Sequence, residues 1–308
     1  MSTTASTSLT TAATPPSVTR TSTRAANGAS KKLTGRGASI AAVVLAVLWT
    51  LPTFGLLVSS IRPERATKTT GWWTFFADPV ITLDNYRAVM STEGSAGLGK
   101  YIINSFVIVV PAVLIPICLA LLASYALAWI DFPGRNMVFI AIFALQIVPI
   151  QVTLLPLLTL YNDAGLSPFW RIWLSHSIFA LPLAIFLLHN FMKEIPKELI
   201  EAARVDGAGH VKIFLSVLLP LLKPAIAAFG IFQFLWVWND LLVALTFAGG
   251  GADVAPITVG VFNLSGTRES AWHLLSAGAF VSIIVPVAVF LGMQRFFVRG
   301  LLAGGLKG

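Results

Sequence analysis

Six long apolar stretches run through the chain, separated by shorter polar segments. Each has about 20 residues or more, the length that an α-helix needs to cross the hydrocarbon core of a bilayer. Because backbone amides in lipid must be paired within the protein, these stretches predict an all-α, polytopic integral membrane protein with six transmembrane helices. Prolines within the spans, Pro149 among them, are expected to kink or break the helices. The expected spans are Ser39–Ile61, Tyr101–Trp129, Met137–Leu160, Ile172–Phe191, Leu221–Phe247 and Trp272–Phe297.

The distribution of positive charge predicts how these spans are oriented. An even number of spans places both termini on the same side, and most of the 21 Lys and Arg residues fall in segments that share that side. Since cytoplasmic segments are enriched in Lys and Arg, the predicted topology is N-in and C-in. This topology puts the polar segment between the fourth and fifth spans in the cytoplasm.

Residues 1–38 differ from the rest of the chain in composition. They are rich in Ser, Thr and Ala and carry Lys and Arg but no acidic residue. Such a segment buries too little apolar surface to offset the entropy of ordering it, so we expect a disordered, basic cytoplasmic tail. An Arg- and Ser-rich start without acids also resembles an organelle transit peptide. A basic flank before a first membrane helix explains it equally well.

Several classes of function lack support in the sequence. The net charge is +8, but no stripe of aromatic and basic residues indicates nucleic-acid binding. The single cysteine, Cys118, excludes an internal disulfide, and no cluster of His, Cys and carboxylates has the spacing of a metal or catalytic site. Residues Gly94–Lys100 match the glycine-rich skeleton of a phosphate-binding loop. However, Tyr101 follows where Ser or Thr is needed, and no strand precedes the segment. If ATP drives this protein, another chain must bind it.

The polar segment from Ile195 to Pro224 predicts two helices joined by a turn. A helix is expected to begin near Pro196, because a first-turn N–H is unpaired in any case. Gly207 is a natural left-handed stop for that helix. A second short helix is expected from about His210 to Leu219, where Pro220 would end it. We interpret the segment as an elbow on which another protein docks.

Within this elbow the pattern is Glu201-Ala202-Ala203, three residues, Gly207, nine residues, and then Val217-Leu218-Leu219-Pro220. The pattern resembles the EAA loop of permease subunits in bacterial ABC importers, a family that usually has Ile where this chain has Val217. The resemblance implies the ABC importer permease fold, with a coupling helix that sits in a cleft of a separate ATPase subunit. In such a loop Glu201 would position the helix, and Ala202 and Ala203 would allow close approach. The ATPase-docking residues implied are Glu201, Ala202, Ala203, Arg204, Asp206 and Gly207.

Two further segments support this resemblance. The end of the chain, from Gln294 to Gly308, resembles the C-terminus of the maltose-type permease, whose tail inserts between the ATPase subunits. This implies a tail contact with the ATPase through Gly304, Gly305 and Lys307. The short loop Asp131–Arg135 also resembles sugar-type members. The resemblance covers residues 39–308, which we assign as one transmembrane permease domain.

A polar group inside the fifth span is the main candidate for a substrate pathway. An ionised Asp at the centre of a bilayer costs roughly 2.5–3.5 kcal/mol, so Asp240 is expected to face a polar pathway or a partner. Trp236 is three residues from Asn239 and four from Asp240, and Gln233 is three from Trp236, so these residues are expected to share a helix face. An aromatic ring beside hydrogen-bonding groups suits a sugar. Alternatively, Asp240 caps a contact with a sister subunit. Gln146 and Gln151 are weaker pathway candidates.

These observations predict a permease subunit of an ATP-driven, binding-protein-dependent sugar importer in the bacterial plasma membrane, with substrates resembling maltose or trehalose. The implied partners are a second homologous permease subunit, a cytoplasmic ATPase dimer, an extracytoplasmic solute-binding protein, the sugar and membrane lipid. The chain itself is predicted to be no enzyme and to hold no cofactor or metal, since ATP and Mg would be bound by the ATPase subunits. The alternatives are a permease of the same fold for peptides, phosphate esters or polyamines, and a secondary transporter. A membrane enzyme has the least support.

Overall fold

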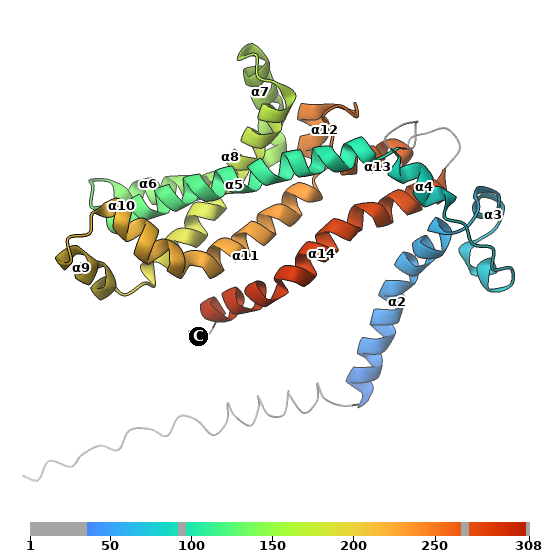
Figure 1. Cartoon of the computed structure of the whole chain (residues 1–308), viewed down its shortest axis with the longest axis horizontal. Helices are drawn as coiled ribbons and strands as arrows, with labels where there is room; N and C mark the ends of the chain where they lie inside the picture. Colours follow the sequence, from blue (N-terminus) through green and yellow to red (C-terminus); the bar gives the residue numbers. More distant parts are fainter. Residues whose placement is uncertain (1–35, 92–96, 266–270, 306–308) are drawn as a thin grey trace, which may run out of the picture. The chain divides into compact units, whose positions relative to one another are not determined.

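The computed structural model describes residues 36–91, 97–265 and 271–305, and every regular element in these ranges is helical (Figure 1). The predicted tail up to residue 35, Gly94 of the glycine-rich segment, and Lys307 lie outside the described residues. The helices are α2 Arg36–Ser60, α3 Glu64–Thr69, η1 Trp72–Phe76, α4 Asp84–Met90, α5 Gly99–Trp129, α6 Arg135–Ala144, η2 Leu145–Ile147, α7 Ile150–Asp163, α8 Pro168–Lys193, α9 Lys197–Val205, α10 His210–Ile213, η3 Phe214–Leu218, α11 Leu219–Trp238, α12 Leu242–Ala248, α13 Ile257–Ser265 and α14 Trp272–Gly305.

Five helical stretches are long and apolar enough to cross a membrane, and a bent pair of helices makes a sixth if the pair is counted as one span. This confirms the prediction of an all-α protein with several membrane spans. The chain divides into one unit up to Gly55 and a second unit from Leu56 onwards. Helix α2 begins in the first unit, and all later helices belong to the second. The five stretches are Gly37–Ser60, Gly99–Trp129, Pro168–Lys193, His210–Trp238 and Trp272–Met293.

The third expected span, Met137–Leu160, is not one straight helix. Helices α6 and η2 form its first part, and α7 continues at an angle of 100° to them. Pro149 lies in the break and is the N-cap of α7. Proline has no N–H to donate, and it disfavours the helical conformation for the residue before it. Val148 is accordingly extended, with ψ at 120°. The break follows directly from the proline that the sequence places there.

The fifth span differs from its predicted bounds at both ends. It starts earlier, because α10, η3 and α11 run on from His210 to Trp238 as one helical stretch, and Pro220 does not stop it as predicted. The segment before Pro220, η3, is π-helical. Its wider turn accommodates a residue that cannot make the usual α-helical hydrogen bond. The span also ends earlier than Phe247, because α11 stops at Trp238 and α12 begins only at Leu242.

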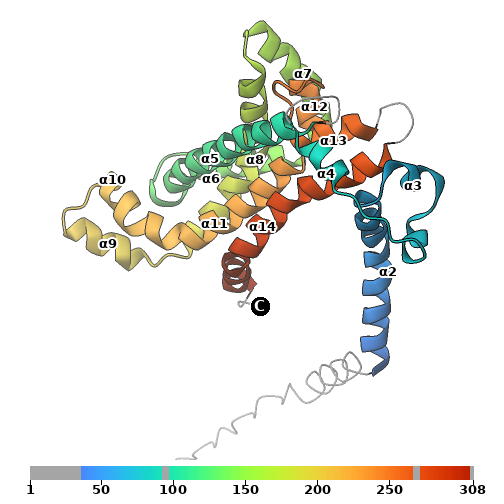
Figure 2. The same ribbon diagram turned by 45° about the vertical axis from the view of Figure 1, so that its right-hand side comes forward.

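Within the second unit, α5, α11 and α14 run side by side in both views, and α8 packs along α5 (Figures 1 and 2). Two apolar cores hold these helices together. One joins the C-terminal halves of α5 and α8 to α9, α10 and the first half of α11. The other joins the N-terminal halves of α5 and α8 to α7, α12, α13 and α14. A buried hydrogen bond from Ser124 Oγ to the carbonyl of Ile185, 3.1 Å long, also links α5 to α8.

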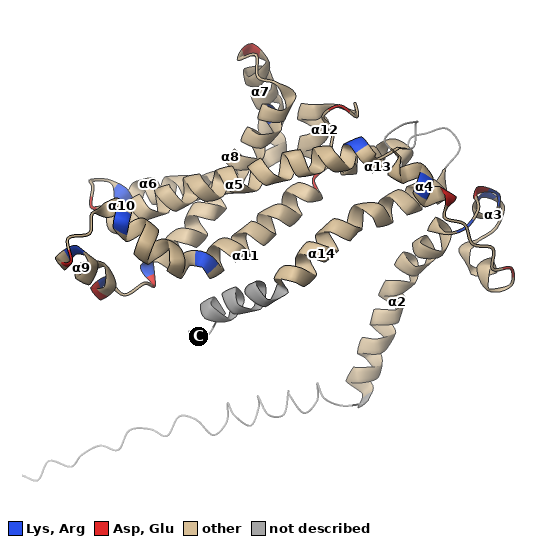
Figure 3. Cartoon of the chain, viewed as in Figure 1, with Lys and Arg blue, Asp and Glu red and all other residues tan. Residues whose placement is uncertain are grey.

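Charged residues of the second unit gather toward the two ends of its helices (Figure 3). One group lies on α9, on α10 and at the start of α11, and another lies on α3, on α4 and at the start of α5. The middle of α5, α11 and α14 between them carries almost none. Two charged zones separated by an apolar zone are what a membrane-spanning bundle requires.

The loop after Gly249 is tied to α5 by hydrogen bonds. The side-chain amide of Asn104 donates to the carbonyls of Ala252 and Ala255, at 2.8 and 3.1 Å. The Oγ of Ser105 accepts the N–H of Ile257 at 2.8 Å. The side chains of Asn104 and Ser105 are buried in α5. The loop that follows Gly249 is therefore anchored to this helix.

Replacing Asn104 by Ala should therefore release this loop. Two hydrogen bonds are lost and two carbonyls lose their partner, which should cost roughly 1–3 kcal/mol. We expect a lower unfolding temperature for the purified protein in detergent and faster proteolysis between residues 249 and 256. The exposed Asn136 provides the control, as Asn136→Ala should change neither. An equal effect of both substitutions would contradict the assigned anchor.

Candidate functional site

The elbow has the helix–turn–helix form that the sequence predicts. Pro196 is the N-cap of α9, with φ −57° and ψ 133°, and α9 runs to Val205. Glu198 lies in the first turn, where the positive end of the helix dipole favours a carboxylate. Gly207 has φ +77°, so the predicted left-handed stop is confirmed.

The turn at Gly207 is a Schellman motif. The N–H of Ala208 bonds to the carbonyl of Ala203, and the N–H of Gly207 bonds to the carbonyl of Arg204, both at 2.9 Å. These are the two hydrogen bonds that define the motif, and they require a left-handed residue at Gly207. A residue with a side chain is strained in that conformation, although the space beside Gly207 is open. The angle between α9 and the following helix is thus set by the backbone itself.

The inner face of the elbow is seated on the ends of the membrane helices. Ile200 and Ile213 are buried in the apolar core that contains the C-terminal halves of α5 and α8. Burying these two side chains stabilises the packing of the elbow on α5 and α8 by about 2 kcal/mol each. The hydroxyl of Tyr125, near the end of α5, is hydrogen-bonded to His210 Nδ1 at 2.7 Å. Ala203, predicted to allow close approach of a partner, packs half-buried against this same core.

The outer face of the elbow combines charged and apolar side chains. Glu201, Ala202, Arg204, Asp206 and Gly207 are all exposed. Two valines that sequence reasoning did not single out lie there as well: Val205 is 88% exposed and Val211 is 72% exposed. These exposed apolar side chains are available for contact with another protein. In the sequence, the positions of Val205 and Val211 on either side of Gly207 could have indicated this exposed apolar surface. As docking residues the predicted set stays a prediction.

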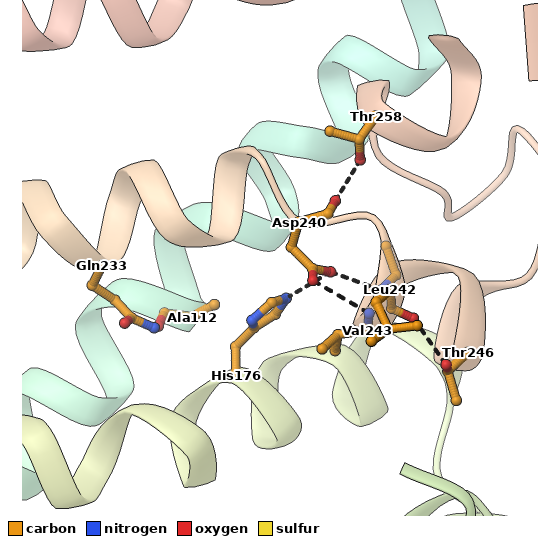
Figure 4. Close-up of polar contacts among 9 residues, drawn as sticks. Ala112, His176, Gln233, Asp240, Leu242, Val243, Thr246 and Thr258 are labelled. Carbon is orange, nitrogen blue, oxygen red and sulfur yellow. Dashed lines mark hydrogen bonds and ion pairs between the residues drawn. The ribbon is translucent and has the colours of Figure 1, made fainter. Parts of the chain in front are cut away.

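The second candidate site is the break between α11 and α12, where Asp240 lies (Figure 4). Its carboxylate accepts the N–H of Ala244 at 2.9 Å and that of Val243 at 3.3 Å, and so caps the first turn of α12. The hydroxyl of Thr258 donates to the backbone carbonyl of Asp240 at 2.6 Å. The polar groups freed by this break are therefore satisfied by neighbouring parts of the chain.

His176 of α8 completes the surroundings of Asp240. Its Nε2 lies 3.7 Å from Asp240 Oδ2, and its side chain is 1% exposed. The ring of Trp236 meets the imidazole edge to face, with the centroids 5.6 Å apart. His176 Nδ1 is buried without a hydrogen-bond partner among the described residues. Sequence reasoning missed this pairing, because residues 64 positions apart meet only through the packing of α8 against α11 and α12.

The other members of the predicted pathway group differ in their surroundings, although Trp236 and Asp240 both meet His176. Helix α11 ends at Trp238, so the continuous helix expected through Asp240 is not present, and Trp236 and Asp240 meet at His176 instead of through helical spacing. Gln233 is buried and donates to the carbonyl of Ala112 at 3.2 Å. Asn239 is exposed and donates to the carbonyl of Leu235, one turn earlier, at 2.7 Å. As substrate contacts, Gln233, Trp236, Asn239 and Asp240 stay a prediction.

Two remaining predictions concern the end of the chain and metal ions. Gly304 and Gly305 are the last residues of α14, and Lys307 lies outside the described residues. Among the residues that the structure describes, no three His, Cys, Asp or Glu side chains are grouped as metal ligands.

Two substitutions separate the capping role of Asp240 from its charge. Asp240→Ala removes the acceptor for two N–H groups and should destabilise the protein by roughly 1–2 kcal/mol. Asp240→Asn keeps one acceptor oxygen and should lose less than half as much. Thermal unfolding in detergent measures both variants. If Asp240→Asn destabilises the protein as much as Asp240→Ala, the charge beside His176 contributes more to stability than the capping hydrogen bonds do.

The chain is similar to known transport proteins over most of its length. The family model described as binding-protein-dependent transport system inner membrane component matches residues 117–302. The osmoprotective compounds uptake permease protein GgtD of Synechocystis sp. is 53% identical, over 87% of this chain and 91% of that protein. The alpha-glucoside transport system permease protein AglG of Rhizobium meliloti is 47% identical, over 82% and 67%.

A solved structure confirms the fold. The crystal structure of a bacterial ABC transporter involved in the import of the acidic polysaccharide alginate matches with a TM-score of 0.72 and 20% identity, over 87% of this chain and 98% of that chain. The matched family model covers the elbow, both helix breaks and most of the span-forming helices. The chain therefore belongs to the family of binding-protein-dependent transport system inner membrane components, the permeases of ABC importers.

Proposed function

We propose that this chain is the permease subunit of a sugar importer and that its substrates are α-glucosides, resembling maltose or trehalose. The similarity to AglG, a permease for alpha-glucosides, supports this substrate class. GgtD, the relative at 53% identity, is an uptake permease for osmoprotective compounds. A solute-binding protein delivers the sugar to the outer face, and the sugar crosses between this chain and a second, homologous permease subunit.

The energy comes from a cytoplasmic ATPase dimer that docks on the elbow. ATP and Mg are bound by that dimer, and this chain holds no cofactor. The observation that carries the proposal is the two-sided elbow. Val205 and Val211 are free on its outer face, while Ile200 and Ile213 fix its inner face to α5 and α8. An exposed apolar surface that is packed firmly on membrane helices passes the movement of a bound protein on to those helices.

Each predicted docking residue has a role in this arrangement. Glu201 and Arg204 are exposed one turn apart and provide polar contacts with the ATPase, and Asp206 provides another beside the turn. Ala202, exposed and small, lets the ATPase approach the α9 backbone, while Ala203 lets α9 approach its own core. Gly207 sets the turn. The C-terminal residues Gly304, Gly305 and Lys307 add a second contact between the ATPase subunits.

Closure of the ATPase dimer on ATP then shifts the two permease subunits between inward-facing and outward-facing states. The elbow lies in the cytoplasm, with the topology N-in and C-in, in the bacterial plasma membrane. Gln233, Trp236, Asn239 and Asp240 contribute to the wall of the pathway. Gln233 and Asp240 do so by bracing α11 against α5 and α12, and Asn239 does so with an exposed amide.

A charge on the outer face of the elbow should uncouple transport without unfolding the subunit. Val205 is almost fully exposed, so Val205→Asp costs the isolated chain little. In the assembled complex the carboxylate would be desolvated against the ATPase, and we expect uptake to fall at least about tenfold. The measurement is binding-protein-dependent sugar uptake into vesicles, together with the amount of subunit inserted.

Val205→Ile keeps an apolar side chain at the same position and serves as the control. It should retain uptake close to that of the parent. Normal uptake by the Val205→Asp variant at normal insertion would exclude the elbow as the coupling surface.

The substrate class is tested by uptake of labelled sugars in membranes that contain the complete complex. The panel is trehalose, maltose, melibiose and raffinose, with a peptide, a polyamine and a phosphate ester for comparison. We expect ATP-dependent uptake of at least one α-glucoside and none of the other three solute classes. Uptake of one of those solutes in preference to every sugar would contradict the proposal, as would sugar uptake by this chain without an ATPase.

A further inference from the structure

The break in the third span opens into a cavity. Its volume is about 440 Å³, which lies within the usual range for sites that hold small molecules. It is lined on one side by residues 145–151, Thr153 and Leu157, and on the other by Ile178, Phe179 and Pro182 of α8.

The position of this break within the apolar sequence is unusual. Pro149 stands at the midpoint of the apolar stretch from Met137 to Leu160. The last turn of η2 and the first turn of α7 therefore leave carbonyl and N–H groups without helical partners far from either end of that stretch. Non-helical backbone in the hydrocarbon region is tolerated only where it is buried in protein or lines a polar cavity.

The two helix breaks of this chain are closed to different degrees. At the second break, the Asp240 carboxylate and the Thr258 hydroxyl satisfy the freed backbone groups. At the first break, no side chain from another helix does so among the described residues. The hydrogen bonds at this break are local: the N–H groups of Val148 and Val152 donate to the carbonyls of Leu145 and Pro149, and the Thr153 hydroxyl donates to the carbonyl of Ile150. The first break therefore keeps polar capacity that the chain itself does not use.

The cavity also holds two amide side chains. Gln146 and Gln151 lie on either side of Pro149 and are exposed. Neither makes a side-chain hydrogen bond within the part of the chain that the structure describes. Each amide has two N–H donors and one oxygen acceptor. Together they offer the donors and acceptors that neighbouring hydroxyls of a sugar require.

The opposite wall of the cavity is apolar. Phe179 contributes an aromatic ring, and Ile178 and Pro182 lie beside it on α8. The C–H faces of a pyranose pack on such a surface while its hydroxyls meet amides on the other side. An ion would find no opposite charge here, because none of the lining residues is charged. The lining therefore fits a neutral polyhydroxylated molecule better than an ionic one.

We propose that this cavity is the site where the permease contacts its sugar during passage, with Gln146 and Gln151 as the hydrogen-bonding residues and Phe179 as the stacking surface. The inference rests on the proposed function of the chain as a sugar permease. It moves the main contact from the α11–α12 break, which the chain closes with its own groups, to the α6–α7 break, which it leaves open.

Single-cysteine labelling tests this site directly. Cys118 is the only cysteine in the sequence, so Cys118→Ser gives a cysteine-free background. Gln151→Cys places a thiol in the cavity. Thr159→Cys, on an exposed part of α7 outside the cavity, is the control. The assembled complex is arrested with a non-hydrolysable ATP analogue, and a small thiol reagent is added with binding protein that is either empty or loaded with the panel sugar that is taken up fastest.

We expect the loaded binding protein to slow labelling of the Gln151→Cys thiol about tenfold at saturating sugar, and to leave the Thr159→Cys thiol unchanged. Equal labelling with and without sugar, in a complex that transports that sugar, would overturn the site but not the proposed function. A Gln151→Cys thiol that never reacts would show that a sister subunit covers the break, and would also overturn the site. No uptake of any panel sugar by the parent complex would contradict the proposed function and, with it, this inference.

Sugar uptake by two further sets of variants gives an independent test of the site. Thr153→Val removes the hydroxyl inside the cavity, and Thr159→Val makes the same change elsewhere on α7. The paired change Gln146→Leu with Gln151→Leu should lower the maximal rate of sugar uptake about tenfold, since two amide contacts are lost. ATP hydrolysis stimulated by the binding protein should persist. Of the two threonine variants, Thr153→Val should lower sugar uptake more than Thr159→Val, because Thr153 lines the cavity and Thr159 does not. Unchanged uptake by the double leucine variant would contradict the proposed contacts.

Discussion

Every backbone amide that enters the hydrocarbon core must find its hydrogen-bond partner within the protein, and this constraint organises the whole structure. It explains why the described elements are all helices and why the long helices run unbroken through their apolar middle. It also makes each interruption meaningful. Where a helix stops inside an apolar stretch, the freed groups require side chains, water or a ligand, so the two breaks, together with the polar elbow between the spans, are where function is to be sought.

The three interruptions solve this requirement in different ways. At Gly207 the backbone closes on itself through two hydrogen bonds and gives a turn of fixed geometry on a polar segment. At Asp240 a carboxylate caps the next helix, and that junction is self-sufficient. At Pro149 the proline opens the helix and neighbouring helices contribute no hydrogen bond among the described residues. The elbow is connected to the membrane helices α5 and α8 through the Tyr125–His210 hydrogen bond and the apolar core that contains Ile200. The elbow is therefore held directly on α5 and α8.

Much of this arrangement could be predicted from the sequence, because its determinants are local. Apolar length gives the spans, Pro196 and Gly207 give the limits of α9, and Pro149 gives the broken third span. The errors arose where a neighbouring part of the chain decides the outcome. Pro220 does not end its helix because a π-helical turn precedes it. The end of α11 at Trp238 depends on α12 being capped by Asp240. The exposure of Val205 and Val211 depends on which face of the elbow packs inward, and sequence spacing alone did not reveal that.

The proposed coupling requires that the elbow faces the cytoplasm and carries the ATPase. A cysteine at Val205 in the Cys118→Ser background, treated with a membrane-impermeant maleimide, tests this most directly. The thiol should react in inside-out vesicles stripped of the ATPase, become protected when the ATPase is added back, and stay unreactive in right-side-out vesicles. Reaction in right-side-out vesicles, or equal reaction with and without the ATPase, would contradict the account.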